Sequence, residues 1–453
     1  MITCLQAKNF KSWKDTDRLE FAPLTGLFGT NSSGKTSILQ MLLMLKQTAE
    51  SPDRKRVLHT GDDRSLVDLG TFFDLIHGTA KDSPLDLSLS WELLKQLDIS
   101  DPEKLSATLY NIASLTFDVT VKSEGERAVV DQFAYSFNSE KFGMSRIPDG
   151  KKKGKYDLVC PNFRATRFSG RPWPLPAPVK CYGFPDEVSA YYQNVGFLSQ
   201  LVLEFEGLFA RVAYLGPLRE YPKRSYVWAG EQPADVGRKG ELAVAALLAS
   251  RAQGMKFSPG PHKHKVTMEN RIEYWLRQMG MISSYALERV KQDRKDYELR
   301  VRTTSSSPEV FVTDVGFGVS QVLPVLVLCY YVPAGSIVVL EQPEIHLHPS
   351  VQAWLADVFI EVVTKRNVQI ILESHSEHLL RRLQRRIAEG WLSSDKAALY
   401  FCRMNGDASA VEKLNIDLLG NITNWPQDFF GNAMEDAVAM VEAAVERKPG
   451  SPA

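Results

Sequence analysis

The segment from Gly29 to Thr36 has the composition of a phosphate cradle. It reads GTNSSGKT and fits the spacing G-x-x-x-x-G-K-[ST] in full. Its glycines leave backbone N–H groups free to surround an anion, and a helix beginning there adds a positive dipole. In such a loop the lysine reaches the β- and γ-phosphates of a nucleotide, and the hydroxyl residue binds Mg²⁺. We therefore expect ATP and Mg²⁺ at Lys35 and Thr36, with the rest of the loop as further contacts: Gly29, Asn31, Ser32, Ser33, Gly34 and Ser37.

A short acidic segment far downstream supplies the chemistry that this loop lacks. The apolar run 337–340 predicts a buried strand, and Glu341 stands at its end. A carboxylate there can hold Mg²⁺ directly or through water. Gln342 follows, and a neutral amide can orient a water molecule but cannot accept its proton. Glu344 is then the candidate base. One nucleotide site is therefore expected to be built from both ends of the chain.

Two further segments predict polar groups at the same site. Residues 314–321 read DVGFGVSQ, a glycine turn that opens a helix, and its free N–H groups with Gln321 form a second phosphate-binding surface. We place Pro324 early in that helix, over 321–331, where a missing N–H costs least. Residues 370–375 predict a strand that ends in His375, at the ligand-binding edge of an α/β sheet. A structural histidine is the alternative, and the order of the segments favours the site.

The predicted elements agree with these positions. A strand precedes the phosphate loop and a helix follows it, whereas a glycine turn without a ligand needs neither. The C-terminal third alternates strand and helix, which predicts a parallel α/β sheet. A β-rich stretch over 85–169 predicts an antiparallel inserted subdomain, and a helix is expected over 187–207. The expected parts are two halves of an ATPase head, an inserted lobe between them and a C-terminal extension: 1–80, 311–400, 81–310 and 401–453.

In this order the motifs resemble the ATP-binding-cassette (ABC) ATPases. The nearest likeness is to the branch with RecF, SMC-type heads and the OLD (overcoming lysogenisation defect) proteins. It rests on ExPEIHLHP at 341–349, which is typical of OLD-like ATPases, and on NFKSW at 9–13. Residues 422–430 also resemble the C-terminal extension of an uncharacterised bacterial subgroup. The resemblance covers 1–80 and 310–430 well and the insertion weakly. It implies an ABC-type P-loop ATPase head of α/β class with an inserted β-rich and helical subdomain.

The resemblance also implies an assembly and further site residues. Two heads would sandwich two ATP molecules, and the glycine turn would contact the γ-phosphate across the dimer through Gly318, Ser320 and Gln321. His375 would be the histidine that senses this phosphate. Asn9 and Lys11 would lie near the base or ribose.

Two residues depart from the family pattern. Gln342 stands where these ATPases usually have the glutamate that polarises water. Gly318 stands where the usual LSGGQ turn has its serine, and Ser320 is displaced towards the glutamine. We therefore predict slow hydrolysis, or use of Glu344 as the base.

Composition excludes several classes of function. The 453 residues include 54 Lys+Arg and 54 Asp+Glu, so no global positive field attracts nucleic acid. The five cysteines have no metal-type spacing, and no apolar run reaches the ~20 residues that span a bilayer, so we expect a cytoplasmic protein without membrane partners. Asp407 lacks the paired aspartate of a two-metal nuclease, so we expect no nuclease activity in this chain. Any cutting would belong to a separate effector.

Several charged clusters have two interpretations. The lysines at 151–155 and the arginines at 164–171, with aromatic residues between them, are the best candidate for nucleic-acid binding, and a solvated loop is the alternative. Four arginines over 381–386 are a candidate phosphate or acidic-partner site. The histidine pairs 262/264 and 346/348 lack further ligands, so structural roles are favoured over a metal site.

The leading hypothesis is a regulatory ATPase of a bacterial anti-phage defence system. It would dimerise or form a higher oligomer through its heads and control a separate nuclease or toxin. The alternatives are a DNA-repair ATPase of RecF type and a nucleotide-dependent scaffold with little turnover. A transport ATPase is disfavoured because its usual LSGGQ turn is missing.

Overall fold

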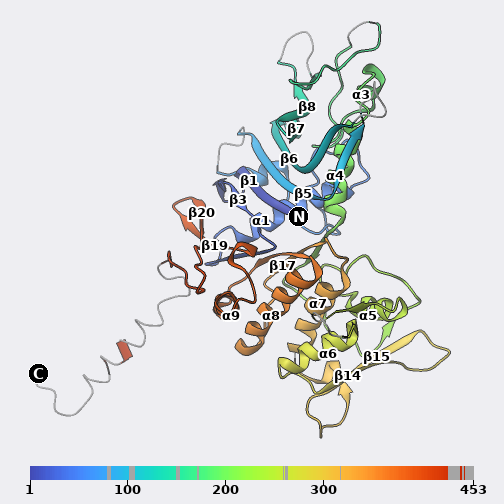
Figure 1. Ribbon diagram of the computed structural model, residues 1–453, viewed down its shortest axis with the longest axis vertical. Helices are drawn as coiled ribbons and strands as arrows, with labels where there is room; N and C mark the ends of the chain where they lie inside the picture. Colours follow the sequence, from blue (N-terminus) through green and yellow to red (C-terminus); the bar gives the residue numbers. More distant parts are fainter. Residues whose placement is uncertain are drawn as a thin grey trace, which may run out of the picture.

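The computed structural model has a six-stranded sheet at its centre (Figure 1). The structure describes residues 1–78, 83–100, 108–148, 154–170, 173–258, 260, 264–316, 318–426, 439–440 and 443. The strand order is β10-β17-β18-β4-β19-β20, and every neighbouring pair is parallel except β19 with β20. The strands are β4 (Leu24–Gly29), β10 (Val212–Leu215), β17 (Ile337–Glu341), β18 (Gln369–Glu373), β19 (Ala397–Asn405) and β20 (Ala408–Lys413).

Both faces of this sheet are covered. In β17, Ile337 and Val339 belong to one apolar core, while Val338 and Leu340 belong to the other. Side chains of a strand alternate between faces, so a strand buried on both sides needs apolar residues at every position. This explains the unbroken apolar run before Glu341. The parallel pairing of β17, β18 and β4 brings the carboxyl ends of these strands to one edge of the sheet.

A second, antiparallel sheet of eight strands lies above the first in Figure 1. Helices α1 (Lys35–Glu50) and α4 (Leu198–Ala210) contribute to the core that joins both sheets. The strands are β1 (Ile2–Phe10), β2 (Trp13–Asp15), β3 (Leu19–Glu20), β5 (Leu85–Ser100), β6 (Thr108–Glu124), β7 (Arg127–Phe137), β8 (Glu140–Arg146) and β9 (Tyr156–Val159).

The β-rich strands continue the sheet that the N-terminal strand begins. Gln6 of β1 lies opposite Ser88 of β5, and Lys8 lies opposite Asp86. The stretch predicted as an antiparallel insertion is therefore antiparallel, and it is joined edge to edge with the N-terminal segment. The domain boundaries themselves stay a prediction.

Helices cover the other face of the central sheet. They form the second core with two small sheets, β11-β15-β14 with β16, and β12-β13. The helices are α5 (Ala243–Ala252), α6 (Met268–Gln278), α7 (Gly318–Tyr331), α8 (Pro349–Arg366) and α9 (Glu377–Ala388). The small strands are β11 (Tyr226–Val227), β12 (Lys256–Phe257), β13 (Val266–Thr267), β14 (Ser284–Arg289), β15 (Asp296–Arg302) and β16 (Val310–Phe311). Short helices are α2 (Phe72–Leu75), α3 (Asp186–Tyr191), and the 3₁₀ turns η1 (Val312–Asp314) and η2 (Ser394–Lys396).

Two predicted helices differ from the structure. The helix expected over 187–207 is interrupted between α3 and α4, at a segment that contains Asn194 and Gly196, both poor helix formers. The helix expected to start at Gln321 starts at Gly318, so Pro324 lies inside α7 and not in its first turn. Its ring packs against the backbone of Gly240, where an added Cβ would lie 2.5 Å from the Pro324 Cβ.

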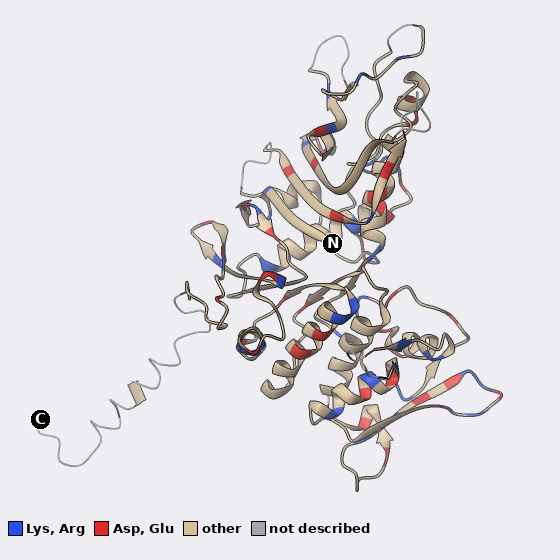
Figure 2. Ribbon diagram, viewed as in Figure 1, with Lys and Arg blue, Asp and Glu red and all other residues tan. Residues whose placement is uncertain are grey.

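Charges of both signs are distributed over all parts of the fold (Figure 2). This agrees with the equal totals of basic and acidic residues. Within the part of the chain that the structure describes, every helix is too short or too polar to cross a bilayer.

Candidate functional site

The phosphate loop connects β4 to α1, as the motif requires. Its glycines are needed for space as well as for backbone conformation. Gly29 has φ 138°, and a Cβ there would lie 2.0 Å from the carbonyl oxygen of Cys402. Gly34 has φ 87°, and a Cβ there would lie 2.4 Å from Oγ of Ser409. Neighbouring β19 and β20 therefore press against the loop, and only glycine fits at either end.

Lys35 is held inside the loop. Its Nζ donates to the carbonyl oxygens of Gly29 (3.2 Å) and Thr30 (2.6 Å) and to Oγ of Ser33 (3.3 Å). The side chain is 3% exposed, and burial lowers the pKa of its ammonium group. A buried cation among backbone groups is suited to a polyanion such as a triphosphate.

A pocket of about 460 Å³ lies over this loop. It brings together most of the residues that the sequence predicted for nucleotide binding, and adds Ser12 and Glu373, which the sequence analysis missed. Its lining is Lys11, Ser12, Asn31, Ser32, Ser33, Gly34, Lys35, Thr36, Ser37, Gln342, Glu373 and His375. The phosphate loop with Lys35, the hydroxyl of Thr36 and the carboxylate of Glu373 together fit a nucleoside triphosphate with its Mg²⁺.

Glu373 is the carboxylate that contacts the phosphate loop. Oγ1 of Thr36 donates to its Oε2 at 2.8 Å. Burial raises the pKa of Glu373, against hydrogen bonds from Thr36 and the Gln342 side chain and the charge of Lys35. The sequence signal was its position at the end of strand 369–373, beside His375, which the sequence analysis noted only for the histidine.

Glu341 lies next to Glu373 in the parallel register of β17 and β18. Its side chain hydrogen-bonds to the hydroxyl of Tyr214, and its Oε1 is buried without a partner among the described residues. Burial, and then the charge of Glu373, raise the pKa of Glu341 to about 7. Its role as a metal ligand stays a prediction.

Arg219 is the buried cation near Glu341. The residue is 8% exposed, and none of its three guanidinium nitrogens has a hydrogen-bond partner in the described part of the chain. Burial lowers its pKa to about 10, against the charges of Tyr214, Glu341 and Glu344. Arg219 therefore balances part of the acidic charge behind the pocket.

Gln342 and His375 both line the pocket, while Glu344 does not. The backbone N–H of Gln342 donates to the carbonyl oxygen of Glu373 at 2.9 Å, and Gln342 has φ 43°. Burial and then the charge of Lys35 lower the pKa of His375, whose ring hydrogen-bonds to the backbone of Gly29. A neutral imidazole is thus expected at pH 7.

Glu344 supports the backbone of His375. Its Oε1 accepts a hydrogen bond from that N–H at 2.7 Å, and burial raises its pKa. Its Oε2 is buried without a partner among the described residues. This geometry suits a positioning role for Glu344.

Of the two residues predicted to lie near the base or ribose, only one lines the pocket. Lys11 lines the pocket, and its Nζ donates to Oε1 of Gln40 at 2.7 Å. The amide of Asn9 donates to the carbonyl oxygen of Pro84 at 2.9 Å, and Asn9 is absent from the pocket lining.

The glycine turn lies apart from the phosphate-loop pocket of the same chain. Gly318 lines a different pocket of about 450 Å³ with His346 and His348. Ser320 and Gln321 are buried in the first turn of α7. Contact between this turn and a nucleotide held by another chain stays a prediction. Phe317, between the two glycines, lies outside the described residues.

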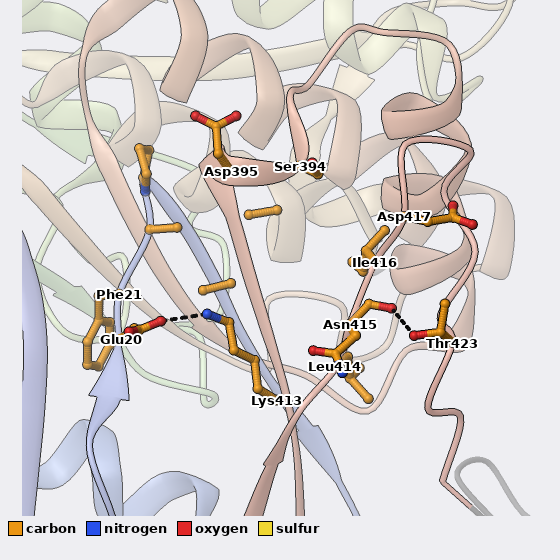
Figure 3. Close-up of a pocket in the computed structure, with 14 residues that line it drawn as sticks. Glu20, Phe21, Ser394, Asp395, Lys413, Leu414, Asn415, Ile416, Asp417 and Thr423 are labelled. Carbon is orange, nitrogen blue, oxygen red and sulfur yellow. Dashed lines mark hydrogen bonds and ion pairs between the residues drawn. The ribbon is translucent and has the colours of Figure 1, made fainter.

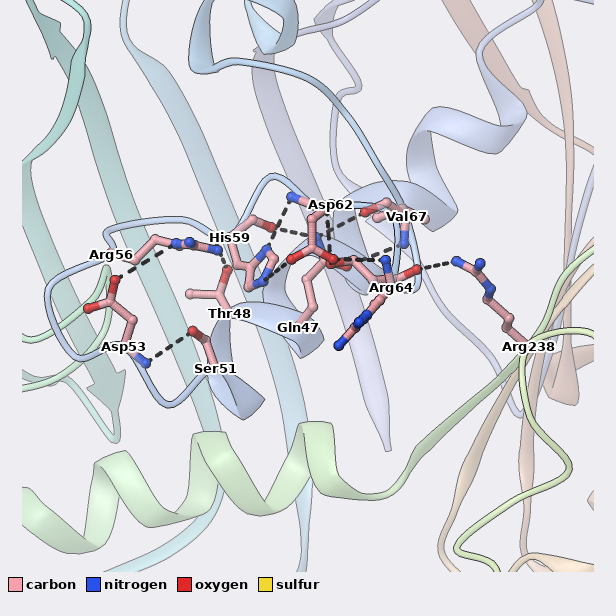
Figure 4. A network of polar contacts seen from close by, with 12 residues as sticks. Gln47, Thr48, Ser51, Asp53, Arg56, His59, Asp62, Arg64, Val67 and Arg238 are labelled. Carbon is pink, nitrogen blue, oxygen red and sulfur yellow. Dashed lines mark hydrogen bonds and ion pairs between the residues drawn. The ribbon is translucent and has the colours of Figure 1, made fainter.

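The loop after α1 connects the phosphate-loop helix to the helical side of the molecule (Figure 4). Gln47 of α1 donates to the carbonyl oxygens of His59 (2.6 Å) and Val67 (3.2 Å). The guanidinium of Arg238 donates to the carbonyl oxygens of Asp63 and Ser65 in the same loop. Arg238 lies close in sequence to Gly240, which packs on Pro324 of α7. The loop after α1 therefore contacts the segment around Arg238, and Gly240, two residues later, contacts α7.

The arginines of α9 form ion pairs within the chain. Arg386 forms hydrogen bonds to both carboxylate oxygens of Asp357, at 2.6 and 2.9 Å, and Arg382 lies 3.5 Å from the same carboxylate. Arg381 pairs with Glu377, and Arg385 with Glu389. Three carboxylates thus pair with these four arginines within the chain, and a role of the cluster as a site for phosphate or an acidic partner stays a prediction.

The remaining candidates are the histidine pairs and the basic residues of the 151–171 region. His348 caps α8, where its ring accepts from the N–H of Ser350. Groups of three or more metal-binding side chains are absent from the part of the chain that the structure describes. Arg167 packs on the ring of Tyr192, its carbon Cζ 4.8 Å from the centroid. Several candidates lie outside the described residues: Lys151, Lys152, Lys153, Arg171 and His262.

Another pocket, of about 560 Å³, lies away from the phosphate loop, between β3, β20 and the turn at 415–423 (Figure 3). Lys413 pairs with Glu20 at its side, at 2.6 Å. Its lining includes no residue of the phosphate loop.

Comparison with known proteins places this site in a family. Solved structures with similar topology include the SMC head domain from Thermotoga maritima, with 11% identity, TM-score 0.43, and coverage of 92% of this chain and 99% of that one. An Smc head domain bound to the C-terminal domain of ScpA, derived from Pyrococcus furiosus, has 9% identity, TM-score 0.43, and coverage of 98% and 99%. No curated protein matches the sequence significantly.

Two family models match parts of the chain. Residues 392–440 match a family described as protein of unknown function (DUF3696). Residues 1–147 and 265–380, more than half of the chain, match the AAA ATPase domain family. This match includes the phosphate loop, Glu341, Glu373 and His375, and the α/β fold expected for an ABC-type P-loop ATPase head is confirmed. The chain therefore belongs to the AAA ATPase domain family.

Proposed function

We propose that this ATPase is a slow, nucleotide-gated regulatory protein. The observation that carries the proposal is Gln342, which lines the phosphate-loop pocket where a carboxylate base would be needed for fast hydrolysis. Glu344, the other candidate base, is buried and bonded to the backbone of His375. ATP would therefore be bound with Mg²⁺ and turned over slowly.

Steady-state ATP hydrolysis by three proteins tests this proposal: the wild type, Gln342→Glu and Glu344→Gln. We expect a slow wild type, a faster Gln342→Glu variant, and a Glu344→Gln variant close to wild type. General-base catalysis typically contributes about 10²–10⁴-fold, so even partial restoration would be measurable. A wild-type rate of many turnovers per second would contradict the proposal. A complete absence of turnover in all three, with ATP still bound, would favour the nucleotide-dependent scaffold.

We further propose that two copies pair through their nucleotide sites. The resemblance to ABC ATPases supports this pairing, since it puts the glycine turn against a nucleotide held by a second copy, and Gly318 lines a pocket separate from the phosphate-loop pocket of its own chain. Sedimentation with and without ATP and Mg²⁺ tests this. A nucleotide-dependent increase in mass supports pairing. A monomer in both conditions, at concentrations where ATP is bound, contradicts it.

The biological setting follows from the resemblance to OLD-like ATPases at 341–349. We propose a defence role in which the nucleotide state controls a separate nuclease or toxin. Purification of the protein from its native operon is the informative experiment. A co-purifying nuclease or toxin subunit supports this role. A lone protein whose ATPase activity rises with gapped DNA would instead support a repair ATPase of RecF type.

A further inference from the structure

Two carboxylates lie side by side at the edge of the central sheet. Glu341 ends β17, Glu373 ends β18, and they are register partners. Their residues are 6% and 2% exposed. Adjacent residues in register point to the same face of a sheet, so both carboxylates compete for the space above that edge. Their surroundings decide which one can serve a bound nucleotide.

The strand order brings Glu373 closer to the phosphate loop. β18 pairs directly with β4, with Glu373 opposite Leu27, two residues before Gly29. β17 lies one strand further away, and each strand adds roughly 4.8 Å. Accordingly, Glu373 lines the pocket and accepts from the Thr36 hydroxyl at 2.8 Å, and Glu341 does neither.

The polar contact of Glu341 is with β10, on the other side of β17 from β18. Its carboxylate hydrogen-bonds to Tyr214 of β10, the strand beyond β17, and it lies in the field of Arg219. Tyr214 lies on β10, on the side of β17 that faces away from β18 and the phosphate-loop strand β4. Its position in the sequence after an apolar strand gives no indication of this.

The contacts of Glu373 hold its carboxylate at the phosphate-loop pocket. Thr36 and the side chain of Gln342 hydrogen-bond to it, and Lys35 contributes positive charge. A hydroxyl and a carboxylate that touch each other beside a phosphate cradle are the oxygen donors that Mg²⁺ prefers in nucleotide sites. The amide of Gln342 cannot act as a base. Its hydrogen bond to Glu373 gives it another role, which is to orient this carboxylate.

We propose that Glu373, and not Glu341, is the principal protein carboxylate for the divalent cation of the bound nucleotide, with Thr36 as its partner. The inference rests on the proposed ATP binding and assigns to Glu341 a supporting position between Tyr214 and Glu373. When bound, the cation would neutralise charge on the β- and γ-phosphates. The alternative is that Glu373 only braces the loop through Thr36.

The test separates metal binding from loop bracing. The affinity of the full-length protein for a fluorescent ATP analogue is measured with Mg²⁺ and with EDTA, and the ratio of the two dissociation constants reports the contribution of the metal. Glu373→Gln keeps an oxygen acceptor for Thr36 but removes the charge. Glu341→Gln is the matched control, since it makes the same change one strand away.

We expect Glu373→Gln to reduce this ratio at least about tenfold, which corresponds to ~1.4 kcal/mol of lost coupling. Its affinity in EDTA should stay equal to wild type or improve, because a negative charge near the phosphates is gone. Glu341→Gln should change the ratio less than about threefold, equivalent to under ~0.7 kcal/mol. Circular dichroism and thermal unfolding check that each variant is folded.

Three outcomes would overturn the inference: an unchanged ratio in Glu373→Gln, an equal loss in both variants, or a wild type that binds equally well in EDTA. If Glu373→Gln does not fold, Glu373→Ala replaces it, and an unchanged ratio in this variant, which has no carboxylate, overturns the inference in the same way. If the wild type binds no ATP analogue in either condition, the proposed function fails instead.

Discussion

The hydroxyl of Thr36 donates a 2.8 Å hydrogen bond to the carboxylate of Glu373, across a separation of 337 residues in sequence. This contact joins the first residues of α1 to the end of β18. It exists because β18 lies between the phosphate-loop strand β4 and the acidic strand β17. The nucleotide pocket is thus lined by Glu373 at the end of β18 and by His375 just after it, and its lining does not include Glu341.

Lys35→Ala should weaken ATP binding strongly. The side chain is a buried ammonium group surrounded by loop oxygens, and its charge is the main cation of the pocket. Hydrogen bonds to charged groups contribute about 1.5–3 kcal/mol, so the dissociation constant should rise roughly 10- to 100-fold or more. Fluorescence titration measures it. Lys14→Ala, at an exposed position of β2, is the control and should bind like wild type.

Glu341→Gln should stabilise the nucleotide-free protein, and more so at high pH. The folded-state pKa of Glu341 is raised from its ordinary value of 4.5 to about 7, so the folded chain binds more protons than the unfolded chain between these values. Its contribution to stability is therefore complete at low pH and is lost as pH rises towards 7 and above.

The glutamine variant lacks this titration. Its advantage over wild type should be small at pH 5 and should grow to as much as about 3 kcal/mol at pH 8. Chemical denaturation across this pH range measures the difference. The exposed change Glu377→Gln is the control. A difference that does not vary with pH would refute the assignment of this shift to Glu341.

Asp357→Ala should destabilise the packing of α8 against α9. The carboxylate is 3% exposed and accepts two hydrogen bonds from Arg386, whose residue is 7% exposed. Removing Asp357 leaves the buried Arg386 with only its ion pair to Glu389 and takes the same partner from Arg382, so we expect a cost of up to about 3–5 kcal/mol. Denaturant unfolding provides the measurement. Glu377→Ala removes the exposed partner of Arg381 and should cost under about 1 kcal/mol. Similar losses in both variants would show that burial is unimportant here.

Gly240→Ala should disturb the contact with α7. Gly240 has φ 76°, and a Cβ there would lie 2.5 Å from Cβ of Pro324. Gly254 has φ 62° with open space around a Cβ, so Gly254→Ala carries the backbone cost alone. We expect Gly240→Ala to be less stable than Gly254→Ala by about 1–3 kcal/mol, the usual cost of overpacking. Equal stabilities of the two variants would contradict this prediction, because they would show that the contact between residue 240 and Pro324 accommodates a methyl group at no cost.

The sequence determined the chemistry of the phosphate loop. Its glycines, Lys35 and Thr36 are consecutive, so a local motif was sufficient to predict their common pocket. The buried character of β17 and β18 was also predictable, because strands covered on both faces need apolar residues at every position. The general α/β class followed from the alternation of strands and helices.

Tertiary structure alone decided which carboxylate meets the loop. Glu341 and Glu373 both end apolar strands, and the sequence does not state which strand lies beside β4. That order depends on how non-consecutive strands pair, a choice made by packing across the whole core. The arginines of α9 show the same limit, since the buried Asp357 that neutralises Arg386 lies on a different helix. Local patterns predict side chains and elements, whereas long-range pairing sets which of their charges remain available for function.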